Sequence, residues 1–255
     1  MIPKIIHYCW FSGDKKPALI RKCIRSWKKY LPDYEIRCWD GNSFDFDSIQ
    51  FTREAMSVKK YAAAADYVRL YALYNYGGIY LDSDVEVFKS LTPFLDNTFF
   101  SGYEFFDKYE IEAGILGSVK GFPFLKECME YYKTTPFIHK DGEYDININQ
   151  APYILTKHAI PYGFKATDLE QTTPNGMHFY PRSIFANEGY SCKTYGFQSA
   201  FNESSLYALH RNMGAWTNVV NQKGSLWKFC WEHNLLDTYK RIENLRVKVL
   251  KPFKK

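Results

Sequence analysis

The sequence lacks the patterns that would assign it to several familiar classes of protein. Its six cysteines are scattered, with no C-x-x-C pair and no cluster of His and Cys at the spacing of a zinc site. No apolar run reaches the ~18 residues that cross a bilayer, and the first residues do not have the layout of a signal peptide. We therefore expect a reduced protein of the cytoplasm, and any contact with a membrane to be peripheral.

The net charge of the chain is also small. The formal charge of +5 is mild for 255 residues, and we expect no nucleic-acid partner. Much of the excess lies in residues 240–255, where seven basic residues accompany one acid, Glu243. Such a tail is typical of a solvated helix end, and it also suits contact with anionic lipid headgroups at the inner face of the cell membrane. Both interpretations stay open from the residues alone.

Aromatic residues, by contrast, are abundant: 21 Tyr, 20 Phe and 6 Trp make up 18% of the chain. Aromatic faces bury large areas, and they also stack on sugars and bases. The excess favours a protein that binds carbohydrate or nucleotide, although a Tyr-rich core and surface would account for most of these residues.

Hydrophobic periodicity predicts alternating strands and helices in the first half of the chain. The best helix, residues 59–76, is rich in alanine and leucine and stops at Gly77-Gly78, the usual kind of glycine cap. We expect further helices at 17–31 and 122–133, and strands at 2–10, 34–39, 79–81, 85–88, 99–103 and 115–116. This alternation is typical of a three-layer α/β sandwich.

The second half of the chain carries a weaker signal. Residues 136–202 look like loops, with Pro, Gly, Asn and Thr among short apolar pieces, and 226–250 is helical in pattern. The simplest division is one domain over 1–225 and a basic helical extension over 226–255.

Two carboxylates follow directly after the short buried strand at 79–81. Asp82 and Asp84 are separated by one residue, and sites in open α/β sheets form just beyond the carboxyl ends of strands. Carboxylate oxygens suit Mg²⁺ or Mn²⁺, which would neutralise a leaving diphosphate. A D-x-D triplet alone is weak evidence, because most such triplets are surface turns.

The helix before this triplet adds a second signal. Asp66 and Arg69 are three residues apart and project from the same helix face, among alanine and leucine that suit packing on a sheet. A charged pair on a packed face needs a reason. Either the two form a buried ion pair that orders the helix, or they contact the hydroxyl and phosphate oxygens of a sugar donor; the residues leave both readings open.

Taken jointly, these elements resemble the signature of glycosyltransferase family 32. An [A/S]-D-x-x-R helix, a G-G-x-Y strand that contains Tyr80, and the D-x-D occur at the family's spacing over 61–84. The family contains sugar transferases of bacterial capsule and lipopolysaccharide synthesis and fungal mannosyltransferases. It is similar, more distantly, to the glucosylating domain of the large clostridial toxins.

The two ends of the chain extend this resemblance. Residues 2–10 are similar to the family's first strand, I-P-K-x-I-H-x-x-W, whose Trp, here Trp10, stacks on the base in the related toxins. We expect His7 of this strand to be a satisfied core histidine. Near the other end, His210 and Trp216 resemble a late H-x(n)-[S/A]-W element, in which the His can complete a metal site and the Trp can reach the diphosphate. Packing roles for Trp10 and Trp216 remain open.

Two segments depart from the family pattern. Glu112 or Ala113 stands where relatives carry an Asn, and Gln150-Ala151 replaces Thr-Gly, so that Gln150 or Asn149 would take over the sugar contact of that turn. We expect the helix that follows Pro152 to be kept, and the choice of sugar to be made around Glu112 and Gln150.

The resemblance implies a GT-A fold and a retaining, metal-dependent transferase that moves a hexose from a nucleotide sugar to a glycan or lipid-linked oligosaccharide acceptor in cell-surface polysaccharide synthesis. A UDP-sugar is the expected donor, with GDP-mannose open, and Mn²⁺ or Mg²⁺ the expected ion. The implied residues are Asp66, Arg69 and Asp84 for catalysis; Trp10, Asp66, Arg69, Tyr80, Asp82 and Trp216 for the donor; and Asp82, Asp84 and His210 for the metal.

Three other interpretations were weighed. A non-catalytic nucleotide-sugar or carbohydrate-binding relative would have lost part of the donor site, but Asp66, Arg69, Asp82 and Asp84 are all present. A metal-dependent phosphohydrolase would add distant Lys and Asp motifs, which are not found. A transferase acting on a protein acceptor is disfavoured by the lack of an evident delivery domain.

Overall fold

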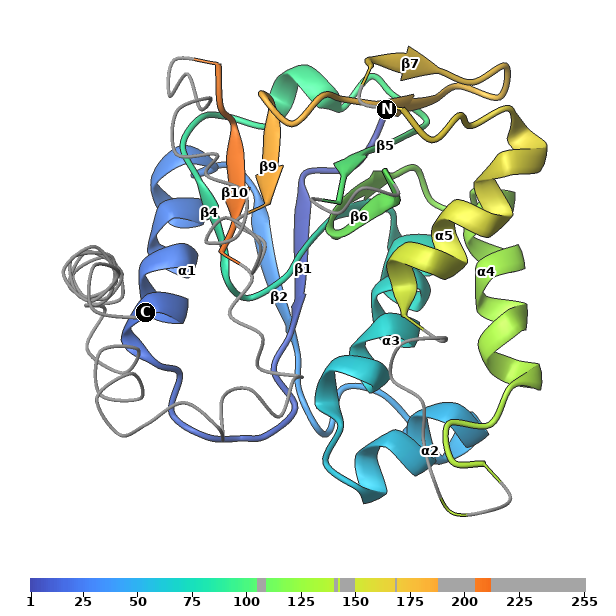
Figure 1. Ribbon diagram of the computed structural model, residues 1–255. Helices are drawn as coiled ribbons and strands as arrows, with labels where there is room; N and C mark the ends of the chain where they lie inside the picture. Colours follow the sequence, from blue (N-terminus) through green and yellow to red (C-terminus); the bar gives the residue numbers. More distant parts are fainter. Residues whose placement is uncertain (105–108, 140–141, 143–149, 168, 188–204, 212–255) are drawn as a thin grey trace, which may run out of the picture.

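The architecture is described from a computed structural model of the chain (Figure 1). The described residues are 1–104, 109–139, 142, 150–167, 169–187 and 205–211. The helix expected at 226–250, the whole extension at 226–255, and Trp216 therefore lie outside the described residues.

A seven-stranded mixed sheet forms the centre of the molecule, with strand order β2-β1-β3-β6-β5-β8-β7. β1 pairs in parallel with both β2 and β3, whereas β6 runs antiparallel to β3 and β5. The carboxyl ends of the first three strands therefore meet at one edge of the sheet. The strands are β1 (Ile5–Cys9), β2 (Glu35–Trp39), β3 (Gly78–Leu81), β5 (Phe99–Tyr103), β6 (Ile111–Ser118), β7 (Gln171–Thr172) and β8 (Met177–Phe179).

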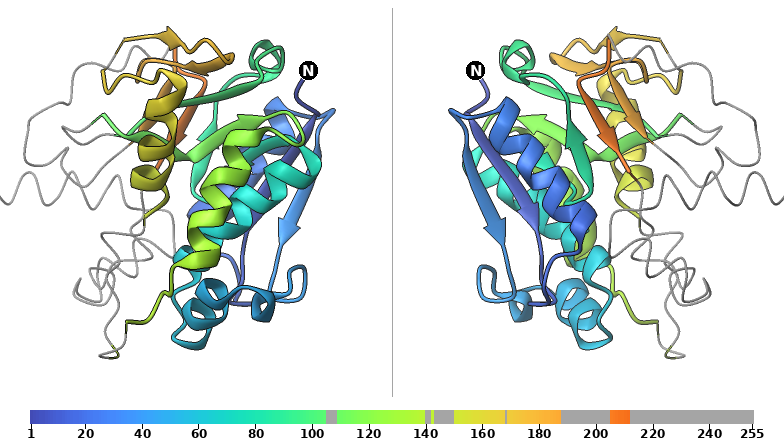
Figure 2. Two further views of the ribbon diagram at one scale, coloured as in Figure 1. Left: turned by 90° about the vertical axis from the view of Figure 1, so that its right-hand side faces the viewer. Right: turned by 90° about the vertical axis from the view of Figure 1, so that its left-hand side faces the viewer.

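Helices cover both faces of this sheet (Figures 1 and 2). On one face lie α3, α4 and α5, and on the other lies α1, so the two apolar cores of the protein are separated by the sheet. The predicted three-layer α/β sandwich is confirmed for the described residues. The helices are α1 (Ala18–Tyr30), α2 (Gln50–Ser57), α3 (Tyr61–Tyr76), α4 (Pro123–Thr134) and α5 (Ala151–Ala159).

The junction between α3 and β3 depends on two glycines. Gly77 ends α3 with φ of +67°, and its N–H donates to the Leu73 carbonyl at 2.8 Å. Gly78 has φ of +107°, and a Cβ there would lie 2.6 Å from the Ile5 carbonyl oxygen. Only glycine adopts such a backbone freely this close to a neighbouring strand. The turn therefore delivers the chain from a helix on the face directly into the middle of the sheet.

A second, three-stranded sheet stands beside α1, with the order β4-β10-β9 (Figure 1). Its strands are β4 (Val85–Val87), β9 (Phe185–Asn187) and β10 (Ala208–His210). The indole N–H of Trp27 in α1 donates to the Val85 carbonyl at 2.8 Å, which ties this sheet to the helix. The strand expected at 85–88 therefore exists, but it belongs to this small sheet and not to the central one.

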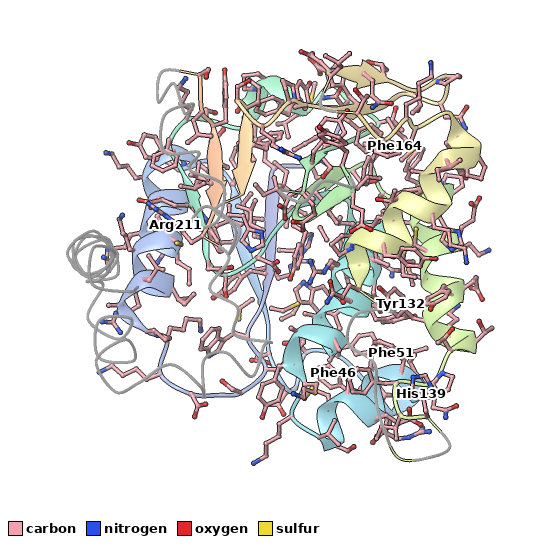
Figure 3. All side chains as sticks on the ribbon, viewed as in Figure 1. Phe46, Phe51, Tyr132, His139, Phe164 and Arg211 are labelled. Atoms are coloured by element: carbon pink, nitrogen blue, oxygen red, sulfur yellow. The ribbon has the colours of Figure 1, made fainter. Side chains whose placement is uncertain are left out.

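Most predicted elements agree with the structure, whereas one helix and several short strands were not predicted. The helix α2 was not predicted; its Phe51 packs edge-on against Tyr132 of α4 with ring centroids 4.8 Å apart (Figure 3). The strands β7, β8 and β9 lie in the region expected to be loop. Each has two or three residues, too few to show a period. β8 and β9 pair with strands far away in the sequence, β5 and β10, and β7 pairs with β8 at the edge of the sheet.

None of the helices in the described part of the chain combines the length and the apolarity of a bilayer-crossing segment.

Candidate active site

The D-x-D triplet forms the turn that carries the chain from the central sheet to the small sheet. Asp82 follows the last residue of β3, and its backbone N–H donates to the Gly114 carbonyl of β6 at 2.8 Å. The Val85 N–H closes the turn on the Asp82 carbonyl at 2.9 Å. Both aspartates are thereby held at the edge of the sheet where β1, β2 and β3 end, the position at which α/β sheets bind ligands.

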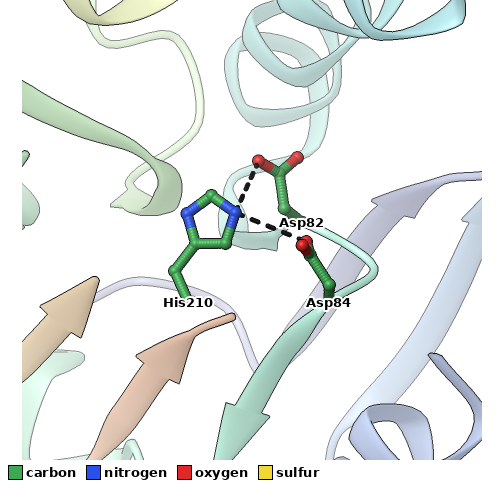
Figure 4. A group of neighbouring side chains, drawn as sticks. All are labelled: Asp82, Asp84 and His210. Carbon is green, nitrogen blue, oxygen red and sulfur yellow. Dashed lines mark ion pairs between the residues drawn. The ribbon is translucent and has the colours of Figure 1, made fainter. Parts of the chain in front are cut away.

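His210 is brought to this turn by strand pairing. It is the last residue of β10, which runs antiparallel to β4 and sets His210 opposite Val85. Its Nε2 lies 3.3 Å from Oδ1 of Asp84 and 3.7 Å from Oδ2 of Asp82 (Figure 4). One ligand atom from each of the three residues lies within 4.8 Å of the others. Two hard oxygens and one imidazole nitrogen fit a divalent ion such as Mn²⁺.

Anions surround His210 on two sides. Burial opposes a charged imidazolium, but the carboxylates of Glu112 and Asp84 outweigh it and raise the pKa of His210 above its usual range. Without a cation, the positive charge that these carboxylates attract is carried by the imidazole ring. A divalent ion would supply that charge instead and would need the ring neutral.

Glu112 is buried inside the protein and contacts His210. Its side chain is fully buried, with Oε1 2.9 Å from Nδ1 of His210 and 2.7 Å from the Gly114 N–H that donates to it. Ala113, beside it, is 3% exposed, and its carbonyl accepts from Arg69. The buried carboxylate of Glu112 is thus engaged with His210, and the choice of sugar by the segments around Glu112 and Gln150 stays a prediction.

Asp66 and Arg69 form the buried ion pair that their spacing allowed. Nη2 of Arg69 lies 2.7 Å from Oδ1 of Asp66, and Nη1 donates to the Ala113 carbonyl at 2.7 Å and lies 3.6 Å from Oδ2 of Asp82. The Arg69 side chain is only 5% exposed. Burial raises the pKa of Asp66 to about 7, against the opposing effect of Arg69. Arg69 thus joins α3, β6 and the D-x-D turn.

Tyr80 lies inside the sheet and supports the same turn. Its ring is 1% exposed, and its hydroxyl donates to Oδ1 of Asp82 at 2.8 Å. The Arg69 guanidinium lies 4.8 Å from the centre of the ring. The tyrosine therefore orients Asp82 from inside the sheet, and its own ring is not accessible to a ligand.

The remaining predicted residues are spread around this centre. Trp10 directly follows β1 and is half-buried; its indole N–H donates to the Asp14 carbonyl at 2.8 Å, and Nζ of Lys16 lies 5.4 Å from its ring centre. Because β1 and β3 run parallel, Trp10 leaves the sheet at the edge where the D-x-D turn leaves it. Trp216 and Asn149 lie outside the described residues.

Gln150 lies at the Asp66 end of the site. It precedes α5, and the N–H of the next residue, Ala151, donates to Oδ2 of Asp66 at 3.3 Å. The helix expected after Pro152 is present as α5. His7 is buried, with Nε2 2.9 Å from the Gly77 carbonyl and Nδ1 accepting from the Trp39 indole at 3.2 Å. It is the satisfied core histidine that was expected.

Sequence reasoning missed one further contact of the site, an ion pair behind β10. Arg211 follows His210, donates its backbone N–H to the Asp84 carbonyl at 3.1 Å, and pairs with Glu86 through Nη2 at 2.5 Å (Figure 3). Glu86 also pairs with Lys22 of α1 at 3.0 Å. The only signal in the sequence was an acidic residue, Glu86, within the apolar strand at 85–88, and it does not indicate which basic residue pairs with it.

The chain was compared with known proteins. Residues 17–101 match the family model described as "Glycosyltransferase sugar-binding region containing DXD motif". Inositol phosphoceramide mannosyltransferase 3 of Schizosaccharomyces pombe is 34% identical over 141 residues, which cover 50% of this chain and 36% of that protein. The uncharacterized glycosyltransferase L373 of Acanthamoeba polyphaga mimivirus is 23% identical over 226 residues, or 85% of this chain and 84% of that one.

Solved structures with a similar fold are also glycosyltransferases. The PaToxG glycosyltransferase shares 18% identity at a TM-score of 0.48, covering 63% of this chain and 69% of its own. The galactosyltransferase LgtC, solved with donor and acceptor sugar analogues, shares 16% identity at a TM-score of 0.42, covering 88% and 99%. Neither TM-score reaches 0.5, and the match to the family model covers residues 17–101. Residues 17–101 therefore match the model of a DXD-containing glycosyltransferase sugar-binding region, and they lie within a three-layer α/β fold.

Proposed function

We propose that the protein transfers a hexose from a nucleotide sugar, with a UDP-sugar as the first candidate, to a glycan or lipid-linked oligosaccharide acceptor of the cell surface, with retention of anomeric configuration. The observation that carries the proposal is the meeting of Asp82, Asp84 and His210 within 4.8 Å at the edge where the strands end. A divalent ion held there by these three residues supplies positive charge for the diphosphate of the donor.

The chain's own residues have distinct roles in this proposal. Trp10, half-buried at the same edge, is the platform for the base. Asp84 holds the ion, Asp82 the ion or the ribose, and Asp66 accepts hydrogen bonds from the sugar. Arg69 donates to Asp66 and to two backbone carbonyls. It contributes positive charge and positions the carboxylates of Asp66 and Asp82. Catalysis then rests on positioning and electrostatics, with no enzymic nucleophile.

The nature of the donor is tested by incubating the full chain with Mn²⁺ and a panel of nucleotide sugars, then following slow donor hydrolysis. The panel includes GDP-mannose, because the Schizosaccharomyces pombe relative is named a mannosyltransferase. Hydrolysis of a UDP-hexose supports the proposal, and hydrolysis of GDP-mannose alone moves it to that donor. If nucleotides bind but no donor is hydrolysed, the chain is a binding module and the catalytic proposal fails.

A matched pair of variants tests the site itself. Asp84→Asn removes one ligand charge at nearly constant volume and is expected to abolish hydrolysis and transfer. Asp33→Asn changes an exposed aspartate that pairs with Lys4 before the amino end of β2, at the opposite edge of the sheet, and should leave both unchanged. Near-normal metal-dependent turnover by Asp84→Asn contradicts the assignment. NMR of the transferred sugar's anomeric proton then decides between retention and inversion.

Contact with a membrane is a separate part of the proposal. It rests on the basic residues 240–255, which lie outside the described residues. Flotation of the full chain with anionic liposomes is compared with that of a chain truncated at about residue 238. Equal flotation removes the proposed membrane contact and leaves the sugar-transfer proposal untouched.

A further inference from the structure

His210 bridges two separate sheets through the two nitrogens of its ring. The residue belongs to β10 of the small sheet, and its Nε2 faces Asp82 and Asp84. Its Nδ1 faces the opposite way, toward Glu112 of β6 in the central sheet, at 2.9 Å from Oε1. The side of the ring away from the aspartates is therefore held by Glu112, which is 98 residues from His210 in the sequence.

The partner behind the ring determines which nitrogen can bind a cation. An ionised carboxylate only accepts hydrogen bonds, so Nδ1 must carry the proton that bonds to Glu112. In the neutral ring the lone pair is then on Nε2, the nitrogen directed at the two aspartates. The contact with Glu112 thus sets both the tautomer and the orientation of His210.

Glu112 is itself held in place. Its side chain is fully buried, its Oε1 accepts from the Gly114 N–H at 2.7 Å, and its backbone carbonyl accepts from Oγ of Ser101 at 2.7 Å. A carboxylate with this burial costs free energy unless it has a specific partner. His210 is one such partner.

Gly114 completes the arrangement. A Cβ on this residue would lie 2.6 Å from Nδ1 of His210 and 2.8 Å from Oε1 of Glu112. The absence of a side chain is what lets the imidazole lie against β6. The carbonyl of the same glycine accepts from the Asp82 N–H, so one residue of β6 helps to place both the aspartate turn and the histidine.

We propose that Glu112 is a positioning residue, which fixes the Nδ1–H tautomer of His210 and so presents Nε2 to the divalent ion. The inference rests on the metal site of the proposed function, and the experiment separates the failure of one from the failure of the other.

The experiment measures Mn²⁺ affinity by the loss of the free-ion EPR signal, with the full chain and no nucleotide. Glu112→Ala removes the acceptor and is expected to weaken Mn²⁺ binding by about 10- to 100-fold, the effect typical of losing the partner of a metal-bound histidine. The contacts of Glu112 with His210 and with the Gly114 N–H are made by the same atom, Oε1. Glu112→Gln keeps that oxygen and is expected to restore most of the affinity.

A control separates positioning from loss of stability. Thr52→Ala removes a buried hydroxyl of α2 that donates to the Phe46 and Ile49 carbonyls, which precede the helix. It should lower the melting temperature without changing Mn²⁺ affinity. If Glu112→Ala folds and binds Mn²⁺ as the wild type does, the inference is overturned. It is also overturned if Glu112→Gln binds as weakly as Glu112→Ala, or if Thr52→Ala weakens binding equally. If the wild type binds no Mn²⁺, the metal site of the proposed function fails, and the inference fails with it.

Discussion

Arg69 and Asp66 form a 2.7 Å ion pair on one face of α3, and the same guanidinium lies 3.6 Å from Oδ2 of Asp82 at the end of the neighbouring strand. The buried guanidinium of Arg69 therefore interacts with carboxylates from two different elements. The structure shows the buried ion pair, and a contact of either residue with a sugar donor stays a prediction.

Removing the positive charge of Arg69 should destabilise the folded protein. Arg69→Met leaves Asp66 buried beside Asp82 without its partner, and we expect a loss of about 3–5 kcal/mol in the free energy of unfolding at pH 7.5, measured by urea denaturation. Arg37→Met breaks an exposed pair with Glu35 and should cost about 1 kcal/mol or less.

A second substitution tests the physical reason. Burial raises the pKa of Asp66 to about 7 even in the presence of Arg69, so the charge of Asp66 is what becomes costly in Arg69→Met. Adding Asp66→Asn to that variant should recover part of the lost stability. Equal losses for Arg69→Met and Arg37→Met would contradict the account.

His7 should make the protein sensitive to acid. Burial lowers its pKa from 6.5 to about 4, so between these values the unfolded chain binds a proton that the folded protein does not. Stability from this group is complete above pH 6.5 and is lost as the pH falls toward 4, by up to roughly 3 kcal/mol.

The measurement compares wild type with His7→Gln by urea denaturation between pH 4 and 8. The stability advantage of the wild type should shrink below pH 6.5 and be constant above it. His139→Gln, which changes an exposed residue after α4 (Figure 3), is the control for replacing a histidine by glutamine. A constant difference between wild type and His7→Gln across the whole range would show that His7 is not held neutral.

Gly78 and Gly13 offer a matched test of crowding in the α3–β3 junction. Both have positive φ, but a Cβ at Gly78 meets the Ile5 carbonyl at 2.6 Å, whereas one at Gly13 has nothing within 4 Å. Gly13→Ala should therefore cost only about 1 kcal/mol of backbone strain. Gly78→Ala should cost several times more or prevent folding, as measured by thermal denaturation and soluble yield. Similar costs would mean that β1 moves aside without penalty.

A bound cation should stabilise the folded chain by mass action. At a Mn²⁺ concentration of about 100 times its Kd, the wild type should gain about 2.7 kcal/mol, seen as a rise in melting temperature that EDTA reverses. His210→Gln should lose most of this gain, because the third ligand is removed. His178→Gln, which alters a histidine paired with Glu170, should respond like the wild type. An equal rise in all three proteins would place Mn²⁺ elsewhere.

Local chemistry made much of this protein predictable. The helix at α3 and its end at Gly77 follow from alanine, leucine and glycine propensities within one segment, and the joint spacing of Asp66, Arg69, Asp82 and Asp84 pointed to the donor site. These signals are local, because helix periods, caps and short motifs are decided by neighbours in the chain. They were sufficient for the alternation of strands and helices and for the aspartates at a strand end.

Only the tertiary structure decided how the distant parts meet. Strand β10 places His210 beside Asp84 through pairing with β4, and β6 places Glu112 behind the same ring. No local pattern specifies such pairings, because they depend on which strands share hydrogen bonds across the sheets. The sequence by itself therefore singled out Asp66, Arg69, Asp82 and Asp84, because their spacing is local. The tertiary structure decided that His210 and Glu112 join them, because strand pairing across the two sheets brings these distant residues together.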